Sequence, residues 1–413
     1  MRENTPHEEH RWTKLGSAAL IMTYVLLFGA NVLSFGLFNY VGLDFRTFYA
    51  SAEIGANEGF DQVYSLDLQT EFQEPIYYEY AKDARIRYET VPTPFFPIFI
   101  APLVPLLVFK PDVSFWIYTL LSLAIALWYS KRLINCFNLQ QYQWLILSIF
   151  ATTPAFLNFF YGQVNIWLLV CIGEFAIAMH RGNELKGGLW LAGWLIKPQT
   201  LIFILPWLFF GRKYRTAAGF LLGSLFVFIS STILAGWDWA SSWIDLLILY
   251  PGNLATTNPG AMINLRALAL NLGSVVAPNF AWAVTITGIV ILTIAVTLTW
   301  RTWKSQELFD LGFLANFAAG LAVTWHAHIH MALPLVVPML SLVGQKALPL
   351  QYWKFWIAVQ ALGLIVGFIA KTWSPQNNIA GLSLLGLNIF FAIWATVKFH
   401  NANKKNDLQN AAC

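Results

Sequence analysis

The 413-residue chain has 57% hydrophobic and only 11% charged residues, including 19 Trp and 33 Phe, which is more apolar surface than one soluble core can hide. The formal charge of +4 is small, and its Lys and Arg lie in short clusters between apolar runs, which argues against a nucleic-acid partner. The apolar runs have the roughly 20-residue length of helices that cross a lipid bilayer. We therefore predict an all-α polytopic membrane protein.

The first apolar run, Leu15 to Phe38, is too long for the core of a signal peptide and is expected to be a retained helix. Arg11 and Lys14 precede it, so the positive-inside tendency places residues 1–14 in the cytoplasm. Residues 39–90 then form a long outer loop. Its density of Tyr and Phe predicts short interfacial helices rather than disorder.

The outer loop begins with NYVGLDFRTFYASAEIGA, which contains Asp44, the first acidic residue after the apolar run. Such a carboxylate can be an ordinary solvated loop residue or a catalytic base at the lipid boundary. Arg46 and Tyr49 follow it, and the sequence assigns neither of them a role.

The next apolar segment, Val91 to Phe109, contains five prolines, each of which removes a backbone donor. If this segment crosses the membrane, four basic residues fall outside, against the positive-inside tendency: Lys131, Arg132, Arg181 and Lys186. If it dips in and returns, they become cytoplasmic, and Leu189 to Phe210 must be a hairpin broken near Lys197-Pro198. We favour the second path, in which protein or a water-filled cavity surrounds the hairpin tip.

The remaining apolar runs predict helices near Ala217–Ala235, Ala281–Trp300, Leu308–Trp325, His330–Val343, Trp353–Ile369 and Ile379–Val397. We divide the chain into a membrane module over residues 15–236, a C-terminal membrane bundle over 237–398 with an outer loop at 237–278, and a polar cytoplasmic tail over 399–413. The last ten residues are expected to be frayed.

On the favoured path several polar groups lie on the outer face. The FFYGQVN loop offers the paired amides of Gln163 and Asn165 as hydrogen-bond donors and acceptors, although Asn165 also suits an ordinary helix cap. Lys197 in LIKPQT is a cation at costly depth, which indicates either an anionic ligand or a structural pairing. Arg266 can grip a phosphate or remain a solvated surface arginine.

The run WHAHIHM places His326, His328 and His330 two residues apart. This spacing can gather metal ligands, yet no cysteine or second histidine cluster completes a site, and sugar hydrogen bonding fits it equally well. A divalent metal is therefore left open and no metal ligand is assigned. Glu174, inside an apolar run, is expected to be a satisfied structural carboxylate.

The order of these motifs resembles glycosyltransferase family 87. The likeness extends from Asp44 to Arg215 and is carried by Tyr64, the Pro-rich PTPFFPIFIAPL, YGQVN, LIKPQ and GRKYR, with GQVN and KPQ the most specific. The chain departs from the family pattern at Pro92-Thr93-Pro94, where adjacent prolines are commoner, and it has no Asp-x-Asp pair.

The resemblance implies a GT-C-type helical bundle with about 10 to 12 membrane segments. It implies an inverting transfer of a hexosyl residue, mannosyl among the options, from a polyprenyl-phosphate-linked sugar to a glycan or glycolipid acceptor outside the plasma membrane. Asp44 would be the base. Lys197 and Arg266 would hold the donor phosphate, while Gln163, Asn165 and the three histidines would orient sugar hydroxyls.

Two other classes of protein remain open from the residues alone. A transporter or lipid-linked sugar flippase usually shows paired repeats and ionisable groups near the midplane, whereas here the polar groups gather on one side. A non-catalytic scaffold of envelope assembly would tolerate replacement of Asp44 and Lys197.

Overall fold

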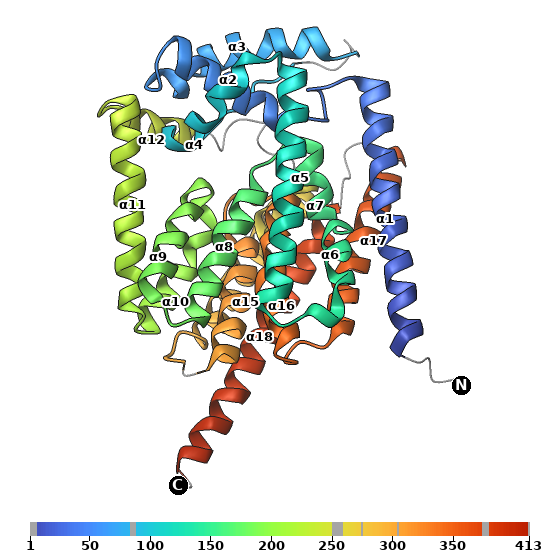
Figure 1. The fold of residues 1–413 in the computed structure, drawn as a ribbon, viewed down its shortest axis with the longest axis vertical. Coiled ribbons are helices and arrows are strands. Elements are labelled where there is room, and N and C mark those ends of the chain that lie inside the picture. The colour runs from blue at the N-terminus through green and yellow to red at the C-terminus, as the bar shows by residue number, and fades with distance from the viewer. Residues whose placement is uncertain are drawn as a thin grey trace.

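The computed structural model describes residues 6–82, 88–249, 259–273, 276–303, 305–373 and 380–411. Within these ranges all regular elements are helical apart from two isolated bridges, Gly36 with Ala81 and Met262 with His328. Figure 1 shows a bundle of long helices with a layer of shorter helices, α2 (Leu43–Asn57) and α3 (Leu66–Tyr80), across one end. We call this the loop end. The predicted all-α polytopic class is confirmed.

The described elements follow one another as α1 (Pro6–Phe35), α2, η1 (Gln62–Tyr64), α3, α4 (Pro97–Ile100), η2 (Ala101–Val108), α5 (Pro111–Cys136), η3 (Gln140–Tyr142), α6 (Trp144–Phe150), α7 (Thr153–Tyr161) and α8 (Asn165–His180). The chain continues with α9 (Glu184–Ala192), η4 (Gly193–Ile196), η5 (Pro198–Ile202), α10 (Ile204–Phe210), α11 (Tyr214–Ala235), α12 (Trp239–Leu249), η8 (Pro259–Ala261) and α13 (Leu265–Leu272). It ends with α14 (Pro278–Thr297), α15 (Gln306–Val323), η9 (Ile329–Leu335), α16 (Val336–Gly344), α17 (Leu350–Trp373) and α18 (Ala380–Ala411).

Long apolar helices make up only part of the expected membrane segments. In the described part of the chain, 5 helices are long and apolar enough to cross a membrane, or 6 if α6 and α7, bent by 55°, form one span. Four further apolar stretches are only 10–17 residues long, namely Pro97–Val108, Asn165–His180, Pro198–Phe210 and Ile329–Gly344. Prolines and polar residues interrupt the chain beside these stretches, which is why continuous spans do not form.

The structure decides the path of residues 184–213. Lys213 Nζ donates to Glu184 Oε1 at 2.8 Å, so the segment begins and ends at the same end of the bundle, opposite the loop end. Its helices break at Lys197, whose φ of −141° and ψ of 67° are not helical. The broken hairpin expected from the charge pattern is therefore present, and its tip lies at Lys197.

The Pro-rich segment 91–109 also follows the favoured path. Thr93 Oγ1 donates to the carbonyl of Thr47 at 3.3 Å, and Tyr49 OH donates to the carbonyl of Phe109 at 2.9 Å. Because Thr47 and Tyr49 both belong to α2, the segment starts and ends at the loop end instead of crossing the bundle. The short helices expected between residues 39 and 90 are α2, η1 and α3.

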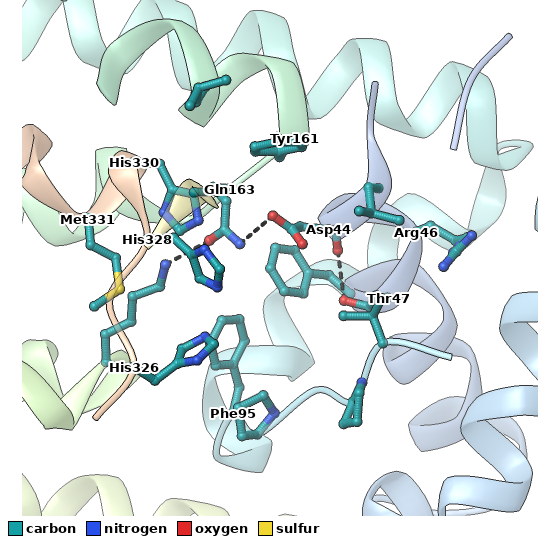
Figure 2. Close-up of a pocket in the computed structure, with 18 of the residues that line it drawn as sticks. Asp44, Arg46, Thr47, Phe95, Tyr161, Gln163, His326, His328, His330 and Met331 are labelled. Carbon is teal, nitrogen blue, oxygen red and sulfur yellow. Dashed lines mark hydrogen bonds between the residues drawn. The ribbon is translucent and has the colours of Figure 1, made fainter. Parts of the chain in front are cut away.

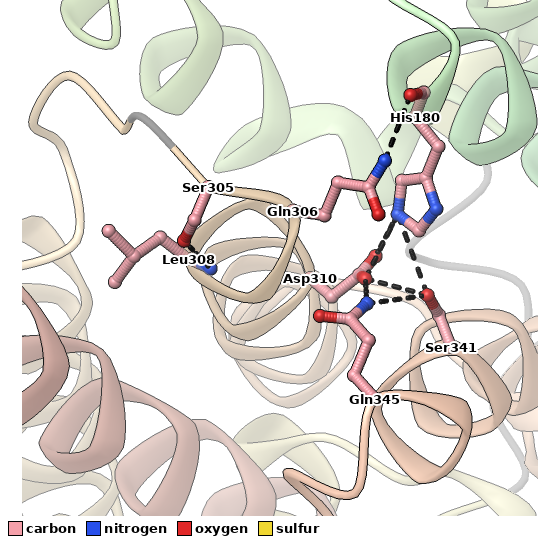
Figure 3. Close-up of polar contacts among 7 residues, drawn as sticks. All are labelled: His180, Ser305, Gln306, Leu308, Asp310, Ser341 and Gln345. Carbon is pink, nitrogen blue, oxygen red and sulfur yellow. Dashed lines mark hydrogen bonds and ion pairs between the residues drawn. The ribbon is translucent and has the colours of Figure 1, made fainter.

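Hydrogen bonds around Asp310 hold helices of the bundle together at the end opposite the loop end. Asp310 of α15 is fully buried and accepts a hydrogen bond from Ser341 Oγ of α16 at 2.6 Å, while His180 Nε2 of α8 lies 3.0 Å from its other oxygen. Gln345 Nε2 also donates to Asp310 (Figure 3). These contacts join three helices of the bundle and stabilise their packing at the end away from the cavity.

Glu174 is a structural carboxylate, as expected. Arg132 of α5 donates to both of its oxygens, at 2.6 and 3.1 Å, and Tyr129 OH donates at 3.2 Å. The bidentate pair neutralises the only carboxylate of α8 and ties that helix to α5.

The C-terminal prediction was wrong in one respect. The last ten residues were expected to be frayed, but those up to Ala411 are helical, because α18 continues to Ala411 and projects from the bundle beyond the other helices (Figure 1). Extending a helix that is already formed needs no new nucleation, so polar residues can prolong it. Of the outer loop at 237–278, residues 250–258 and 274–275 lie outside the described part.

Candidate active site

A cavity of about 750 Å³ lies at the loop end, where α2 faces the interrupted helices of the bundle (Figure 2). Its lining includes six of the residues singled out from the sequence: Asp44, Gln163, Lys197, His326, His328 and His330. Each of them lies at or beside a helix end or a break between helices. Asn165 and Arg266 were expected in the same site, but they do not line the cavity.

Asp44 occupies the first turn of α2. Gly42 precedes that helix in the left-handed region, with φ of 76°, and its amide donates to the carbonyl of Phe160 at 2.8 Å. This bond fixes the start of α2 against the end of α7. The exposed amides of a first helical turn favour a carboxylate, and Asp44 Oδ2 also accepts a hydrogen bond from Gln163 Nε2 at 2.7 Å.

The surroundings of the Asp44 carboxyl favour its protonated form more than water does. Burial raises its pKa above the ordinary aspartate value of 3.8, while the Gln163 hydrogen bond and the charges of Lys197 and Arg46 oppose part of that rise. A carboxylate with a raised pKa is a stronger base than an exposed one.

We expect the pH profile of activity to report this group. Only the ionised carboxylate can accept a proton, so kcat/KM should rise as the pH increases through the pKa of Asp44, with an acid limb above 3.8. The measurement is kcat/KM of the purified protein across acidic and neutral pH. A profile that stays flat down to the ordinary aspartate value would contradict a catalytic carboxyl at this position.

Gln163 joins Asp44 to Lys197. Its Oε1 accepts a hydrogen bond from Lys197 Nζ at 2.8 Å, while its Nε2 donates to Asp44, so both ends of the amide are occupied (Figure 2). Tyr118 OH donates to the backbone carbonyl of Gln163 at 3.1 Å and holds the loop. The buried cation and the carboxylate are therefore linked through one oriented amide, and each keeps further hydrogen-bonding capacity for a ligand.

Gly162 allows the turn at the end of α7 that positions Gln163. This glycine ends α7 with φ of 72°, and a Cβ there would lie 2.6 Å from the Cβ of Phe45 and 3.2 Å from the ring of Phe115. Only glycine satisfies both the backbone conformation and this close approach of α7 to α2.

We expect Gly162→Ala to destabilise the protein more than Gly182→Ala. Both glycines have φ of 72°, so each alanine has a backbone strain of roughly 1–3 kcal/mol, but nothing lies within 4 Å of a Cβ at Gly182. The clash with Phe45 should add about 1–3 kcal/mol. Thermal unfolding in detergent measures the difference, and equal shifts would show that the α2–α7 contact carries no stability.

Asn165 lies behind the cavity wall and contacts it through His330. It is fully buried, its Nδ2 is 3.0 Å from His330 Nδ1, and both its backbone amide and its Nδ2 donate to Asn158 Oδ1, at 3.0 and 3.2 Å. The alternative of a helix N-cap does not hold, because Asn165 is the first residue of α8 and Val164 is the N-cap.

The three histidines of the WHAHIHM run follow one cavity wall. The ring centroids of His326 and His328 are 4.5 Å apart, and those of His328 and His330 are 5.8 Å apart (Figure 2). In the described residues no group of three or more His, Cys, Asp or Glu side chains is arranged to hold a metal ion. The histidines thus offer the cavity a row of hydrogen-bonding rings.

Arg266 does not line the cavity itself but stacks on Trp325, which does. Its guanidinium lies 4.2 Å from the ring centroid of Trp325, which lines the cavity and is 53% exposed. A guanidinium on an aromatic face has a fixed position. Arg266 therefore supports Trp325 and brings positive charge to that side of the cavity.

Arg46 is a structural cation that sequence reasoning left without a role. It is 1% exposed, donates to the carbonyls of Phe38 and Glu89 at 3.1 Å each, and lies over the rings of Tyr77 and Tyr88. Burial lowers its pKa to about 10, so the guanidinium stays protonated at neutral pH. Arg46 ties α2 to the chain on both sides of it.

Aromatic and aliphatic lining residues were also missed. Trp243 of α12 donates from Nε1 to the carbonyl of Pro94 at 2.8 Å, and together with Leu247 it gives that side of the cavity an apolar surface. Tyr161 and Phe95 line it as well. Their positions at the ends of apolar runs are typical of interfacial belts, so composition alone did not separate them from other aromatics.

The comparisons with known proteins agree with the motif order. The model of glycosyltransferase family 87 matches residues 94–325, more than half of the chain, and this range includes Gln163, Lys197 and Arg266. It also reaches well beyond Arg215, where the likeness seen in the motifs ended. No curated protein and no solved structure matches the chain.

Proposed function

The chain belongs to glycosyltransferase family 87 and is a membrane glycosyltransferase, and on that premise we propose that it transfers a hexosyl residue from a polyprenyl-phosphate-linked donor to a glycan or glycolipid acceptor. Mannose is one candidate for the sugar. The observation that supports the proposal is the arrangement of Asp44, Gln163 and Lys197 in one cavity, in which a carboxyl and a buried lysine contact the two ends of a single amide.

Asp44 is the proposed general base. As an acceptor hydroxyl attacks the anomeric carbon from the face opposite the phosphate, its proton passes to the Asp44 carboxylate and the new glycosidic bond forms. The bond between the anomeric carbon and the phosphate oxygen breaks at the same time, and the leaving polyprenyl phosphate keeps the electron pair. One displacement inverts the anomeric configuration, so a single carboxylate is enough.

Lys197 is the proposed partner of the leaving phosphate. In its protonated form Nζ has three N–H groups and gives one to Gln163, which leaves two for phosphate oxygens in a buried setting where charge is poorly screened. Arg266 adds positive charge through its place behind Trp325. The apolar surface of Trp243 and Leu247 fits the first isoprene units of the lipid.

We assign sugar recognition to the cavity wall that carries the histidines of the WHAHIHM run. His326 and His328 line the cavity beside Lys197 and are proposed to hydrogen-bond sugar hydroxyls. Gln163 and Asn165 were expected to bind sugar directly. Since both ends of the Gln163 amide are occupied and Asn165 does not line the cavity, we now propose that they act by orienting Asp44 and His330.

We propose that the protein resides in the plasma membrane with its cavity on the outer face. Basic residues support this orientation because Lys131, Arg132, Arg181, Lys186 and Lys213 all lie near helix ends opposite the loop end. The cavity lies at the loop end, which faces away from the cytoplasm in this arrangement.

The function is tested with purified protein in vesicles that hold no ion gradient. Polyprenyl-phosphate-linked hexoses and, in parallel, nucleotide-linked hexoses are supplied with a glycolipid acceptor, and the new glycosidic bond is detected by mass spectrometry. We expect product of inverted anomeric configuration from the lipid-linked donor alone. Product from the nucleotide sugar alone would overturn the donor assignment, and retained configuration would overturn the direct displacement.

A further inference from the structure

The hydrogen bonds behind the cavity determine which nitrogen of His330 carries its proton. The first link is free of ambiguity, because the backbone amide of Asn165 can only donate. It lies 3.0 Å from the atom assigned as Asn158 Oδ1 and makes a hydrogen bond with it. That atom of Asn158 must therefore be the carbonyl oxygen and not the amide nitrogen.

The second link orients the Asn165 side chain. One of its terminal atoms lies 3.2 Å from Asn158 Oδ1 and 3.0 Å from His330 Nδ1. An oxygen there would face the Asn158 carbonyl oxygen, so the atom must be Nδ2, which has two N–H groups and can donate to both neighbours. His330 Nδ1 is then the acceptor and carries no hydrogen.

The third link leads back to the cavity. A neutral imidazole with a bare Nδ1 has its hydrogen on Nε2, and an imidazolium would direct an Nδ1–H against the Asn165 N–H. His330 Nε2 makes no hydrogen bond with the described residues. It is also not one of the buried atoms that lack a hydrogen-bond partner, so it is accessible from the cavity that His330 lines.

We propose that Asn158 and Asn165 hold His330 in the neutral Nε2–H tautomer, so that it presents a directed hydrogen-bond donor to a phosphate oxygen of the donor beside Lys197. This role rests on the proposed function. The N–H of a neutral imidazole does not ionise near neutral pH. Beside Lys197 in the cavity lining, this N–H suits a phosphate oxygen that gains negative charge as the sugar leaves. His330 contacts the substrate, and the two asparagines are positioning residues.

The tautomer is measured on the full-length protein without substrate. Histidine labelled with ¹⁵N is incorporated, and the His330 signals are assigned by their loss in His330→Gln. We expect a protonated Nε2 and a bare Nδ1 in the wild type. In Asn165→Asp the new carboxylate should accept from Nδ1–H and reverse the pattern. A wild-type His330 with its hydrogen on Nδ1 overturns the proposal even if the enzyme transfers sugar.

The role is tested by two substitutions of matched chemistry. The Nε2 of glutamine approximates the position of histidine Nε2, whereas asparagine reaches only as far as Nδ1 and keeps the contact with Asn165. We expect His330→Asn to lower kcat about 10²-fold, as for loss of one oxyanion donor, with His330→Gln much less affected. Equal losses in the two variants would overturn the proposal, as would an effect confined to the KM of the acceptor.

A binding measurement separates phosphate from lipid. Polyprenyl phosphate and the corresponding polyprenol are titrated into wild type and His330→Asn. We expect the substitution to weaken binding of the phosphate and to leave polyprenol binding unchanged, and equal weakening of both overturns the phosphate contact. If the wild type transfers no sugar from a polyprenyl-phosphate donor, the proposed function fails while the tautomer result stands.

Discussion

Replacing Asp44 with asparagine is expected to reduce sugar transfer by about 10²–10⁴-fold, the usual contribution of a positioned general base. The asparagine carbonyl can still accept the hydrogen bond from Gln163 Nε2, so the start of α2 and the cavity wall should keep their arrangement. The variant loses only the ability to take the proton of the acceptor hydroxyl. Turnover of the lipid-linked donor measures the loss, and donor binding should change little.

Asp67→Asn is the matched control. Asp67 is an exposed carboxylate in the first turn of α3, in the same layer of helices as Asp44, and it does not line the cavity. Its replacement should leave transfer unchanged. Undiminished product from Asp44→Asn, with membrane insertion and thermal stability intact, would exclude Asp44 as the base.

Replacing Lys197 with glutamine is expected to lower kcat by about 10²–10³-fold. The substitution removes the buried cation that is proposed to meet the leaving phosphate, and it removes the donor that orients Gln163 toward Asp44. A second effect follows from the charge. Without Lys197 the Asp44 carboxylate loses a favourable neighbour, so its pKa should rise further and the acid limb of kcat/KM should move to higher pH.

Lys186→Gln controls for the loss of a lysine from the same hairpin. Lys186 is exposed on α9, at the end away from the cavity, and its replacement should affect neither kcat nor the pH profile. If Lys197→Gln lowered kcat without moving the acid limb, Lys197 would serve the phosphate alone and the link through Gln163 would carry no charge effect. Unchanged kcat would exclude both roles.

Much of the fold was predictable from local properties of the chain. The apolar run before Asp44, the prolines of residues 91–109 and the basic clusters were enough to predict the broken hairpin at Lys197 and the segment that returns to the loop end. The hydropathy pattern did not show that four of the apolar stretches are short helices of 10–17 residues. Hydropathy measures apolar content and does not reveal where a helix breaks.

The candidate site was predictable as a set of residues and less so as an arrangement. Spacing and residue type selected Asp44, Gln163, Lys197 and the histidines, all of which line one cavity. They did not show that Arg266 stacks behind Trp325 or that Arg46 is buried as a structural cation. Each of those facts depends on contacts between segments that are far apart in the chain.

The sequence by itself determined the class of protein and selected the carboxyl and the lysine that we propose for the site, because hydrophobicity and charge are properties of the residues themselves. The tertiary structure decided how these groups are connected: the Gln163 amide lies between Asp44 and Lys197, and Asn165 turns His330 toward the cavity. The direction of a hydrogen bond depends on how each helix is rotated and packed against its neighbours, and no pattern along one chain specifies that rotation.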